Sequence, residues 1–397
     1  MEGTRIDTVS VEKFIKRSWP MLVLGAVLIL AASVALFWFA VSGKARKTSS
    51  PSVVLAATST DETVTSTPDL VPRSLDGVLV PVEQANLQPF AVMVENYIDA
   101  RPLSGPAEAN LAFEFPVEGG ITRFMLVFDA TSTVDQIGPV RSARPYFVDM
   151  ADSLNAVYAH VGGSPQALAN ITTLQAQGFR NLDQFANGKY FWRSDTRVAP
   201  HNAYTRMDLL NQADAAKSWK AGSFHGWSYK EDYPLVATAT TVARGEDPGP
   251  KILYGGSYNV SWSYDRDSNM YVRSEGGALE KDLDGAQVKA KNVVVLETDD
   301  SVIDSDGRLN IRTTGKGKAE LFHDGREDEI TWSRSTGLSL QFQSLDGSDV
   351  LFDRGTTWVE VVTNPAMYNA AVKGTSFTPP PITGDSTSST SSTDNTN

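Results

Sequence analysis

Residues 137–168 read IGPVRSARPYFVDMADSLNAVYAHVGGSPQAL, and this stretch decides the expected fold of the first half of the chain. Pro145 suits the first position of a helix, where its missing N–H costs nothing, and apolar residues follow it at helical spacing. The next run, AVYAHV, has the length and composition of a strand. After the glycine pair, Ser164 and Pro165 begin a second helix, which Gly178 is suited to end. The stretch therefore predicts helix, strand, turn and helix.

Buried strands are expected on the N-terminal side of this stretch. Residues 89–97 form a short apolar run, and residues 111–118 and 121–129 read as two strands around a Gly-Gly turn. Side chains alternate between the two faces of a strand, so Arg123 is expected opposite the aromatic residues of its run. Together with the helices, these strands predict a mixed α/β first domain at residues 78–217.

A helix that follows the loop APHNAYT should close this first domain. Thr205 and Asp208 have the spacing of a capping box, and apolar residues then recur at helical spacing. The loop itself has no periodicity and carries His201.

The second half of the chain is a series of short strands. The composition changes in the connector at residues 218–249, and the strand-like runs that follow are separated by Asp-Gly pairs. The pairs lie at 284–285, 306–307, 324–325 and 346–347. This pattern predicts a smaller, antiparallel β-rich second domain at residues 250–365, and the fold class is α+β.

Residues 21–41 form the one long apolar run that suits a membrane. The run MLVLGAVLILAASVALFWFAV contains no charge, and about 20 such residues cross a bilayer as a helix. We predict a transmembrane helix that serves as a signal anchor, with residues 1–20 as a cytoplasmic tail. Basic residues flank the run on both sides, so charge bias does not fix its direction. A cleaved signal peptide is the alternative, although its apolar region is usually shorter.

Two segments are too polar to form a core. Residues 42–77 are rich in Ser, Thr, Pro and Ala, and residues 378–397 form a Ser/Thr-rich tail. We interpret the first as a disordered stalk and the second as a disordered tail. A stalk between a membrane helix and a globular body favours a cell-membrane protein whose domains lie on the extracytoplasmic side.

Composition excludes several classes of function. The net charge of −12 argues against general nucleic-acid binding, which needs a basic face. The chain contains no cysteine, so disulfides, thiolate metal sites, cysteine nucleophiles and a lipid-modified cysteine are excluded. The oligomeric state is not indicated.

The same central stretch contains a candidate anion site. A strand, a glycine pair and a helix start direct backbone N–H groups at one point, and guanidinium groups nearby suit phosphate or carboxylate. The candidate residues are Arg123, Arg141, Arg144, Gly162, Gly163 and Ser164. In the alternative interpretation the glycines only turn the chain, and the arginines pair with acids such as Glu114, Glu118 or Asp149.

His160 and His201 are candidates for catalysis as an acid and base pair. Each could equally be a structural hydrogen-bonding residue. No zinc motif is present, so no metal is expected, and no nucleotide-binding motif indicates a cofactor. Ser164 does not fit a nucleophile elbow, because Gln166 stands where the last glycine of that motif should be.

Several long strings resemble the YerB-like family of bacterial envelope proteins. They are EGGITRF, IGPVRSARPYF, YAHVGGSPQAL, PHNAYT and GTTWVEVV, and the resemblance covers about residues 78–365. It implies a membrane-attached extracytoplasmic protein with an N-terminal α/β part and a C-terminal β-rich part, both catalogued as domains of unknown function. Many members look like lipoproteins with an anchoring cysteine. Because this chain has none, the apolar helix is expected to replace the lipid.

Two functions remain open at this point. The first is a cell-envelope binding or scaffolding module that recognises an anionic group, with His160 beside the arginines. The second is a hydrolase or transferase that acts on a phosphate- or carboxylate-bearing envelope component with the histidine pair. The second requires His160 and His201 to share a site.

Overall fold

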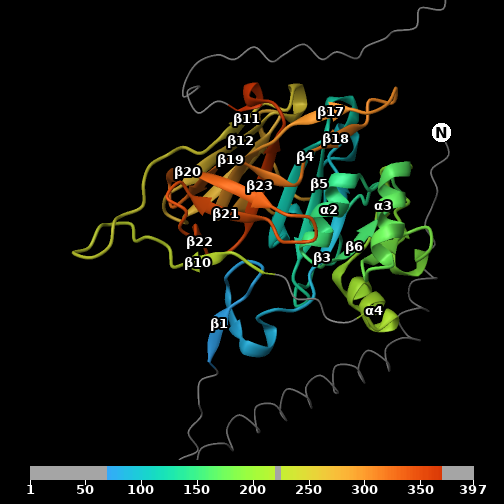
Figure 1. Cartoon of the computed structure of the whole chain (residues 1–397), viewed down its shortest axis with the longest axis horizontal. Helices are drawn as coiled ribbons and strands as arrows, with labels where there is room; N and C mark the ends of the chain where they lie inside the picture. The colour runs from blue at the N-terminus through green and yellow to red at the C-terminus, as the bar shows by residue number, and fades with distance from the viewer. Residues whose placement is uncertain (1–68, 220–224, 369–397) are drawn as a thin grey trace, which may run out of the picture. The chain divides into compact units, whose positions relative to one another are not determined.

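One large sheet dominates the computed structural model, which describes residues 69–219 and 225–368 (Figure 1). Within these ranges the sheet has ten strands. In spatial order they are β21 (Gln341–Ser344), β20 (Arg326–Arg334), β19 (Gly315–His323), β16 (Asn292–Glu297), β23 (Thr357–Val362), β4 (Leu111–Pro116), β5 (Thr122–Phe128), β3 (Phe90–Glu95), β6 (Val157–His160) and β7 (Arg180–Asp183). The strands predicted at 89–97, 111–118 and 121–129 are thus β3, β4 and β5.

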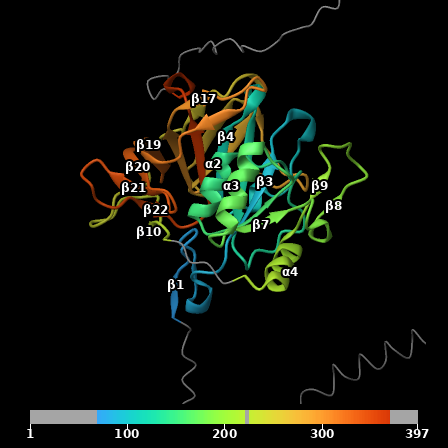
Figure 2. The same ribbon diagram turned by 45° about the vertical axis from the view of Figure 1, so that its right-hand side comes forward.

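Helices and a second sheet cover the two faces of the large sheet. The helices are α2 (Pro145–Ser153), α3 (Pro165–Gln175) and α4 (Met207–Lys217). Residues of α2 and α3 share one buried apolar cluster with Met125 and Val127, whereas α4 shares the other with Phe124 and Leu126. Figures 1 and 2 show α2 and α3 side by side on their face. The alternation along β5 therefore places Arg123 on the face of α2 and α3, opposite Phe124, as predicted.

A smaller sheet also packs on the second face, where its Trp262 and Tyr271 belong to the same apolar cluster as Phe124 and Leu126. It consists of β11 (Lys251–Ile252), β12 (Val260–Asp265), β13 (Met270–Glu275), β14 (Ala278–Leu279) and β15 (Lys289–Ala290). Short strand pairs complete the sheets: β1 (Leu70–Pro72) with β2 (Leu79–Pro81), β8 (Trp192–Arg193) with β9 (Ala203–Tyr204), β10 (Ser228–Lys230) with β22 (Leu351–Asp353), and β17 (Asp300–Val302) with β18 (Leu309–Ile311).

The two halves of the chain meet within the large sheet. Strand β23, from the second half, pairs in parallel with β4, from the first half, and Glu360 lies opposite Glu114 in the register. Strand β23 also pairs in parallel with β16. The second half is therefore not purely antiparallel, in contrast to the sequence-based expectation. Parallel pairing requires a long connection, and β17 to β22 provide it between β16 and β23.

Most of the predicted turns and helix ends are present. The Ser164 hydroxyl accepts a hydrogen bond from the Ala167 N–H as the cap of α3. Gly178 has a φ of +103°, which ends that helix in the left-handed region. Asp324 and Gly325 both have positive φ and join β19 to β20 as a two-residue hairpin.

The capping box predicted for α4 is wrong. The helix begins after Arg206, and no side chain caps it. Thr205 is fully buried, and its hydroxyl donates to the carbonyl oxygen of Tyr190 instead. The backbone of Thr205 pairs with Ile137, and this bridge turns the threonine towards the core.

The predicted membrane span at residues 21–41 lies outside the described residues, as do most of the predicted stalk and the whole C-terminal tail. Within the described ranges, no helix combines the length and apolar character that crossing a membrane requires.

Candidate functional site

The candidate residues gather at one edge of the large sheet. Strands β3, β6 and β7 are mutually parallel, and β4 runs in the same direction, because both β3 and β4 are antiparallel to β5. The carboxyl ends of these strands therefore meet at the same edge, which is where ligands bind in many open α/β sheets. Glu95 ends β3, His160 ends β6, and Arg123 stands near the start of β5, opposite Glu95.

Residues 137–144, from the stretch that predicted the fold, cross this edge. The Arg141 N–H donates to the carbonyl oxygen of Met93, and the Arg141 carbonyl accepts from Val161. Further along, Ala143 forms a parallel bridge with Gly163. The segment is thus held between the ends of β3 and β6, and it carries Arg141 and Arg144 to the edge.

Glu95 joins Arg141 to His201. Its Oε2 atom lies 2.8 Å from His201 Nδ1 and 3.4 Å from Arg141 Nε. The Oε1 atom is buried and accepts no hydrogen bond from the described residues. Burial raises the pKa of the Glu95 carboxyl, and the charges of Arg141 and His201 oppose this rise. Tyr97 stacks on His201 with ring centroids 5.4 Å apart, which fixes the plane of the imidazole.

Arg123 and Arg144 complete a group of three neighbouring arginines. Arg144 pairs with Glu118, as the alternative interpretation expected, with Nε 3.0 Å from Oε2. Arg123 is 4% exposed, and its Nη1 donates to the Ser142 carbonyl oxygen at 2.7 Å. Among the ion pairs of the described residues, none includes Arg123. Burial and the charge of Arg144 lower its pKa to about 10, so it is still a cation at neutral pH.

The glycine turn contributes to the edge but does not present a free cradle. The Gly162 N–H donates to Asp183 at 2.9 Å, and the Ser164 N–H donates to the Ala143 carbonyl oxygen at 3.2 Å. Gly163 is needed for close packing, because a Cβ there would lie 3.1 Å from the Ala143 Cβ. The predicted N–H groups of Gly162 and Ser164 are therefore used within the fold.

The two histidines have separate environments. His160 is fully buried, with Nδ1 2.7 Å from the Gly162 carbonyl oxygen and Nε2 2.7 Å from Asn181 Oδ1. His201 is partly exposed and contacts Glu95 and Tyr97. Among the described residues they share no hydrogen-bond or ring-stacking partner, and both ring nitrogens of His160 are engaged. A proton-transferring pair of His160 with His201 is thus not supported by these contacts.

The site residues that the sequence did not single out are Glu95 and Tyr97. A glutamate directly after a buried apolar strand was the available signal, because a charge at a strand end must find partners there. We define Glu95, Arg123, Arg141, Arg144 and His201 as the edge cluster. It can hold an anion, and the Glu95–His201 pair can position an imidazole for proton transfer.

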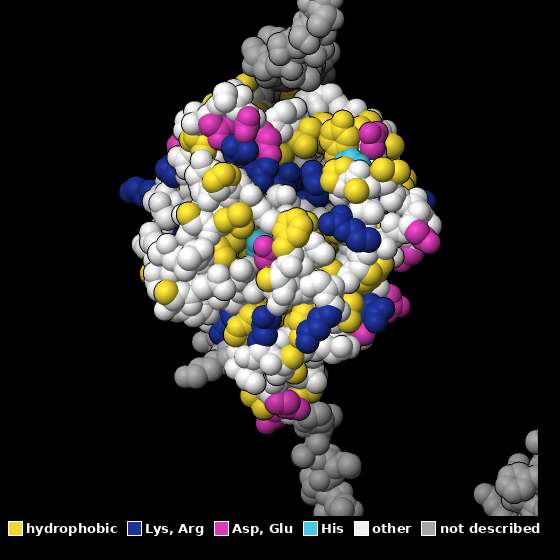
Figure 3. Space-filling model, turned by 90° about the vertical axis from the view of Figure 1, so that its right-hand side faces the viewer, with side chains coloured by type: hydrophobic (Ala, Val, Ile, Leu, Met, Phe, Trp, Pro, Cys, Tyr) yellow, Lys and Arg dark blue, Asp and Glu magenta, His cyan; other side chains and the backbone are white. Residues whose placement is uncertain are grey.

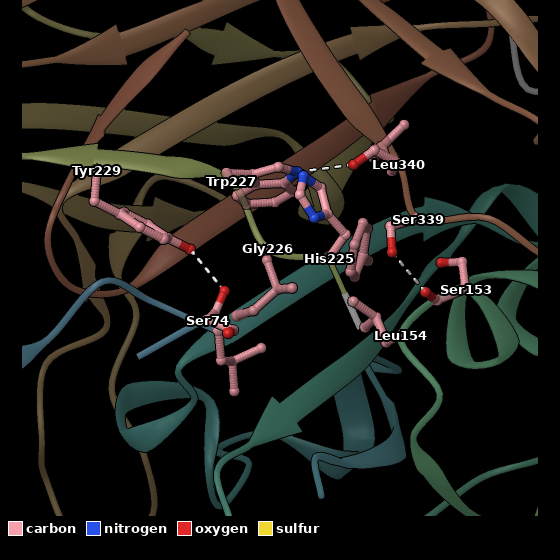
Figure 4. A pocket seen from close by; sticks show the side chains of 12 residues that line it. Ser74, Ser153, Leu154, His225, Gly226, Trp227, Tyr229, Ser339 and Leu340 are labelled. Atoms are coloured by element: carbon pink, nitrogen blue, oxygen red, sulfur yellow. Dashed lines mark hydrogen bonds between the residues drawn. The ribbon is translucent and has the colours of Figure 1, made fainter. Parts of the chain in front are cut away.

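Other hollows offer less. The one in Figure 4 has a volume near 10 Å³, enough for about one water, and Trp227 closes it by donating to the Leu340 carbonyl oxygen. A neighbouring open hollow of 1050 Å³ is lined by short polar side chains and Arg334. The guanidinium of Arg334 is engaged by the carbonyl oxygens of Thr313 and Asp149.

One group of described residues has the donor atoms for a metal ion, namely His323, Asp324 and Asp353. All three are buried, and the Lys230 ammonium contacts both aspartates. Asn269 also donates to Asp324 at 2.8 Å. We call Lys230, Asn269, His323, Asp324 and Asp353 the lysine cluster. Its cation is supplied by the chain itself.

The comparisons with known proteins agree with this two-part architecture. Residues 75–220 match the N-terminal domain of a protein family of unknown function, DUF3048, and residues 251–359 match its C-terminal domain. The chain is 32% identical over 294 residues to "Putative lipoprotein YerB" of Bacillus subtilis (strain 168), covering 72% of this chain and 85% of that protein. The crystal structure of Bacillus subtilis YerB matches with a TM-score of 0.66 at 28% identity, over 75% of this chain and 99% of that one. The chain therefore belongs to the YerB-like family, whose two parts are the N- and C-terminal DUF3048 domains.

Proposed function

We propose that the protein is a membrane-anchored, extracytoplasmic binding module of the cell envelope that recognises an anionic group at the edge cluster. Arg123 and Arg141 hold the anion, Arg144 adds positive charge next to them, and His201 lines the same edge. Gly162, Gly163 and Ser164 hold the arginine-bearing segment in place through the backbone contacts of Ala143.

The main support for this proposal is the environment of Arg123. A buried guanidinium is costly unless an anion pairs with it, and this one is paired with a carbonyl oxygen only, among the described residues. Glu118 pairs with Arg144, and Glu95 lies with Arg141 and His201. The three arginines of the edge cluster therefore have two carboxylates, Glu95 and Glu118, near them. A bound phosphate or carboxylate would balance the remaining positive charge.

Membrane attachment rests on two independent supports. Residues 21–41 are long and apolar enough to anchor the chain, and its relative YerB is by name a lipoprotein. Either form of attachment places a stalked body outside the membrane.

Calorimetric titration with inorganic phosphate, and separately with acetate, tests the anion site. A suitable protein is residues 67–397, because the described body belongs to a compact unit that begins at Thr67. Its counterpart in YerB was crystallised as a chain that matches this body over 99% of its length. Arg123→Gln should weaken binding at least about tenfold, since a charge-assisted hydrogen bond contributes roughly 1.5–3 kcal/mol.

Arg334→Gln is the matched control. Arg334 is also buried in the large sheet and donates to carbonyl oxygens, but it lies in another hollow. It should bind like the wild type. If neither anion binds the wild-type protein, or if Arg123→Gln binds equally well, the anion site is refuted.

The Glu95–His201 pair favours a second candidate, a hydrolase or transferase acting on a phosphate- or carboxylate-bearing envelope component. With Nδ1 held by Glu95, the Nε2 atom of His201 is the nitrogen available to accept a proton from a nucleophile. Here Glu95 is a positioning residue, and His160 takes no part.

Hydrolysis of p-nitrophenyl acetate and p-nitrophenyl phosphate by the same fragment tests this candidate. His201→Gln should abolish turnover, and Glu95→Gln should reduce kcat while leaving KM similar. His225→Gln controls for the loss of a histidine. Absence of turnover in the wild type, or turnover that His201→Gln retains, argues against an enzyme with this pair.

A further inference from the structure

Large apolar side chains are exposed around the edge cluster. Tyr97 and Ile98 are 38% and 49% exposed, and Tyr97 stacks on His201. Val198 is 82% exposed, and its carbonyl oxygen accepts from the His201 N–H. Tyr97 and Val198 contact His201, so exposed apolar side chains lie next to the edge cluster.

Exposed apolar side chains also lie next to the glycine turn. Phe185 is 74% exposed, and its ring lies where a Cβ on Gly162 would be 2.9 Å away. Leu168, 39% exposed, contacts the position of a Gly163 Cβ in the same way. We define the apolar rim as Tyr97, Ile98, Leu168, Phe185 and Val198.

Residues of the apolar rim contact His201 or the glycine turn beside the edge cluster. Figure 3 faces the side on which α3 and α4 lie, and Lys and Arg side chains form a band across its upper part with hydrophobic side chains next to them. Exposed apolar groups beside basic ones are typical of surfaces that meet a lipid interface, where the acyl boundary takes the apolar groups and headgroups take the charge.

The proposed anchor would tether the body to a membrane. The segment from residue 42 to residue 68 can extend at most about 95 Å from the end of the predicted anchor. Tethering raises the effective concentration of membrane lipid at the body, so weak contacts with it are populated.

Building on the proposed anion site, we propose that its occupant is the phosphate headgroup of an anionic membrane phospholipid, with the apolar rim dipping into the lipid surface around it. Arg123 and Arg141 contact the phosphate. The side chains of Ile98, Phe185 and Val198 contact the acyl boundary. The protein as a whole is acidic, so attraction to the lipid is local to this edge.

Vesicle flotation of residues 67–397 tests the proposal. The fragment lacks the predicted anchor, so any flotation comes from the body. Vesicles of phosphatidylcholine with 30 mol% phosphatidylglycerol should carry the protein, and vesicles of phosphatidylcholine should not. Arg123→Gln should weaken binding at least about tenfold, as expected for inorganic phosphate. Arg141→Gln should weaken binding about fivefold, the factor for one basic residue near an anionic surface.

The apolar rim is tested by the double variant Ile98→Ser, Val198→Ser. It should lose vesicle binding at least about tenfold while keeping its affinity for inorganic phosphate. Leu345→Ser is the control, because Leu345 is 65% exposed directly after β21, the strand at the end of the large sheet opposite β7. It should float like the wild type.

The outcomes separate this inference from the proposed function. Phosphate binding without flotation on anionic vesicles overturns the lipid assignment and leaves a soluble anion or polymer as the ligand. Equal flotation on both vesicle types, or flotation that survives the double serine variant, also overturns it. Loss of phosphate binding by the wild type refutes the proposed function itself.

Discussion

The edge cluster and the lysine cluster are two groups of charged side chains that differ in how their positive charge is paired. In the lysine cluster, Lys230 contacts Asp324 and Asp353, and Asn269 donates to both aspartates. In the edge cluster, Arg123 is buried with only a carbonyl oxygen as a hydrogen-bond partner among the described residues. In the lysine cluster, charges within the chain balance one another. In the edge cluster, the described residues carry more positive than negative charge.

The difference shows how a structural cluster can be told from a binding site. Both contain residue types that bind ligands: the imidazole and carboxylates of the lysine cluster suit a metal ion, and the guanidinium groups of the edge cluster suit an anion. What separates them is whether an internal counter-charge is present. A buried charge that is paired contributes little to stability, and a buried charge that is unpaired costs free energy. The edge cluster is therefore the one to test for a ligand.

Lys230→Ala should have the largest effect. Removing the ammonium leaves two buried carboxylates together, and breaking a buried pair in this way costs about 3–5 kcal/mol of unfolding free energy. Chemical denaturation measures it. Zn²⁺ should restore part of the loss in the variant, because His323, Asp324 and Asp353 remain as ligands. A loss below about 1 kcal/mol would mean that the cluster is not held by its charges.

Arg123→Met should act in the opposite direction. Because the fold lowers the pKa of Arg123 to about 10, its charged form is disfavoured in the native state at every pH below that value. Replacing it should raise the unfolding free energy by roughly 1–2 kcal/mol without anion, and should abolish stabilisation by added phosphate. A destabilised variant would show that Arg123 is a structural residue.

Ser164→Ala should lower stability by about 1 kcal/mol, the usual contribution of a helix cap, and leave phosphate affinity unchanged. Thermal unfolding and phosphate titration check the two halves of this statement. Reduced phosphate affinity at unchanged helix content would show that Ser164 belongs to the anion site.

The smallest expected effect is a pH slope from His323. Burial opposes its protonation, but the hydrogen bond to Asp328 and the nearby charge of Asp353 outweigh burial and raise the pKa of the imidazole. The native state therefore binds the proton more tightly than the unfolded chain. This stabilisation is complete below about pH 6.5, and it is lost as the pH rises through the native pKa. His323→Gln should flatten this slope above about pH 6.5, and His225→Gln should not.

Part of the site could be predicted from the sequence because local signals report local structure. Arg141 and Arg144 precede a helix start that proline marks, and the alternation in β5 placed Arg123 on its face. Glu95 and Tyr97 could not be paired with His201, since 106 positions separate Glu95 from that histidine and the contact exists only when two loops meet. The same limit made His160 and His201 look like partners.

Local patterns were enough to predict the helix, strand, turn and helix of residues 137–168, the family, the hairpins of the second half and the apolar anchor candidate. Spacing, caps and turn residues act over a few positions, which is why they can be read directly. The folded arrangement was needed to show that β23 joins β4 in one sheet, that Lys230 completes one cluster, and that Arg123 has no ion-pair partner among the described residues. Charge balance in a folded protein depends on distant segments meeting, and no local pattern contains that information.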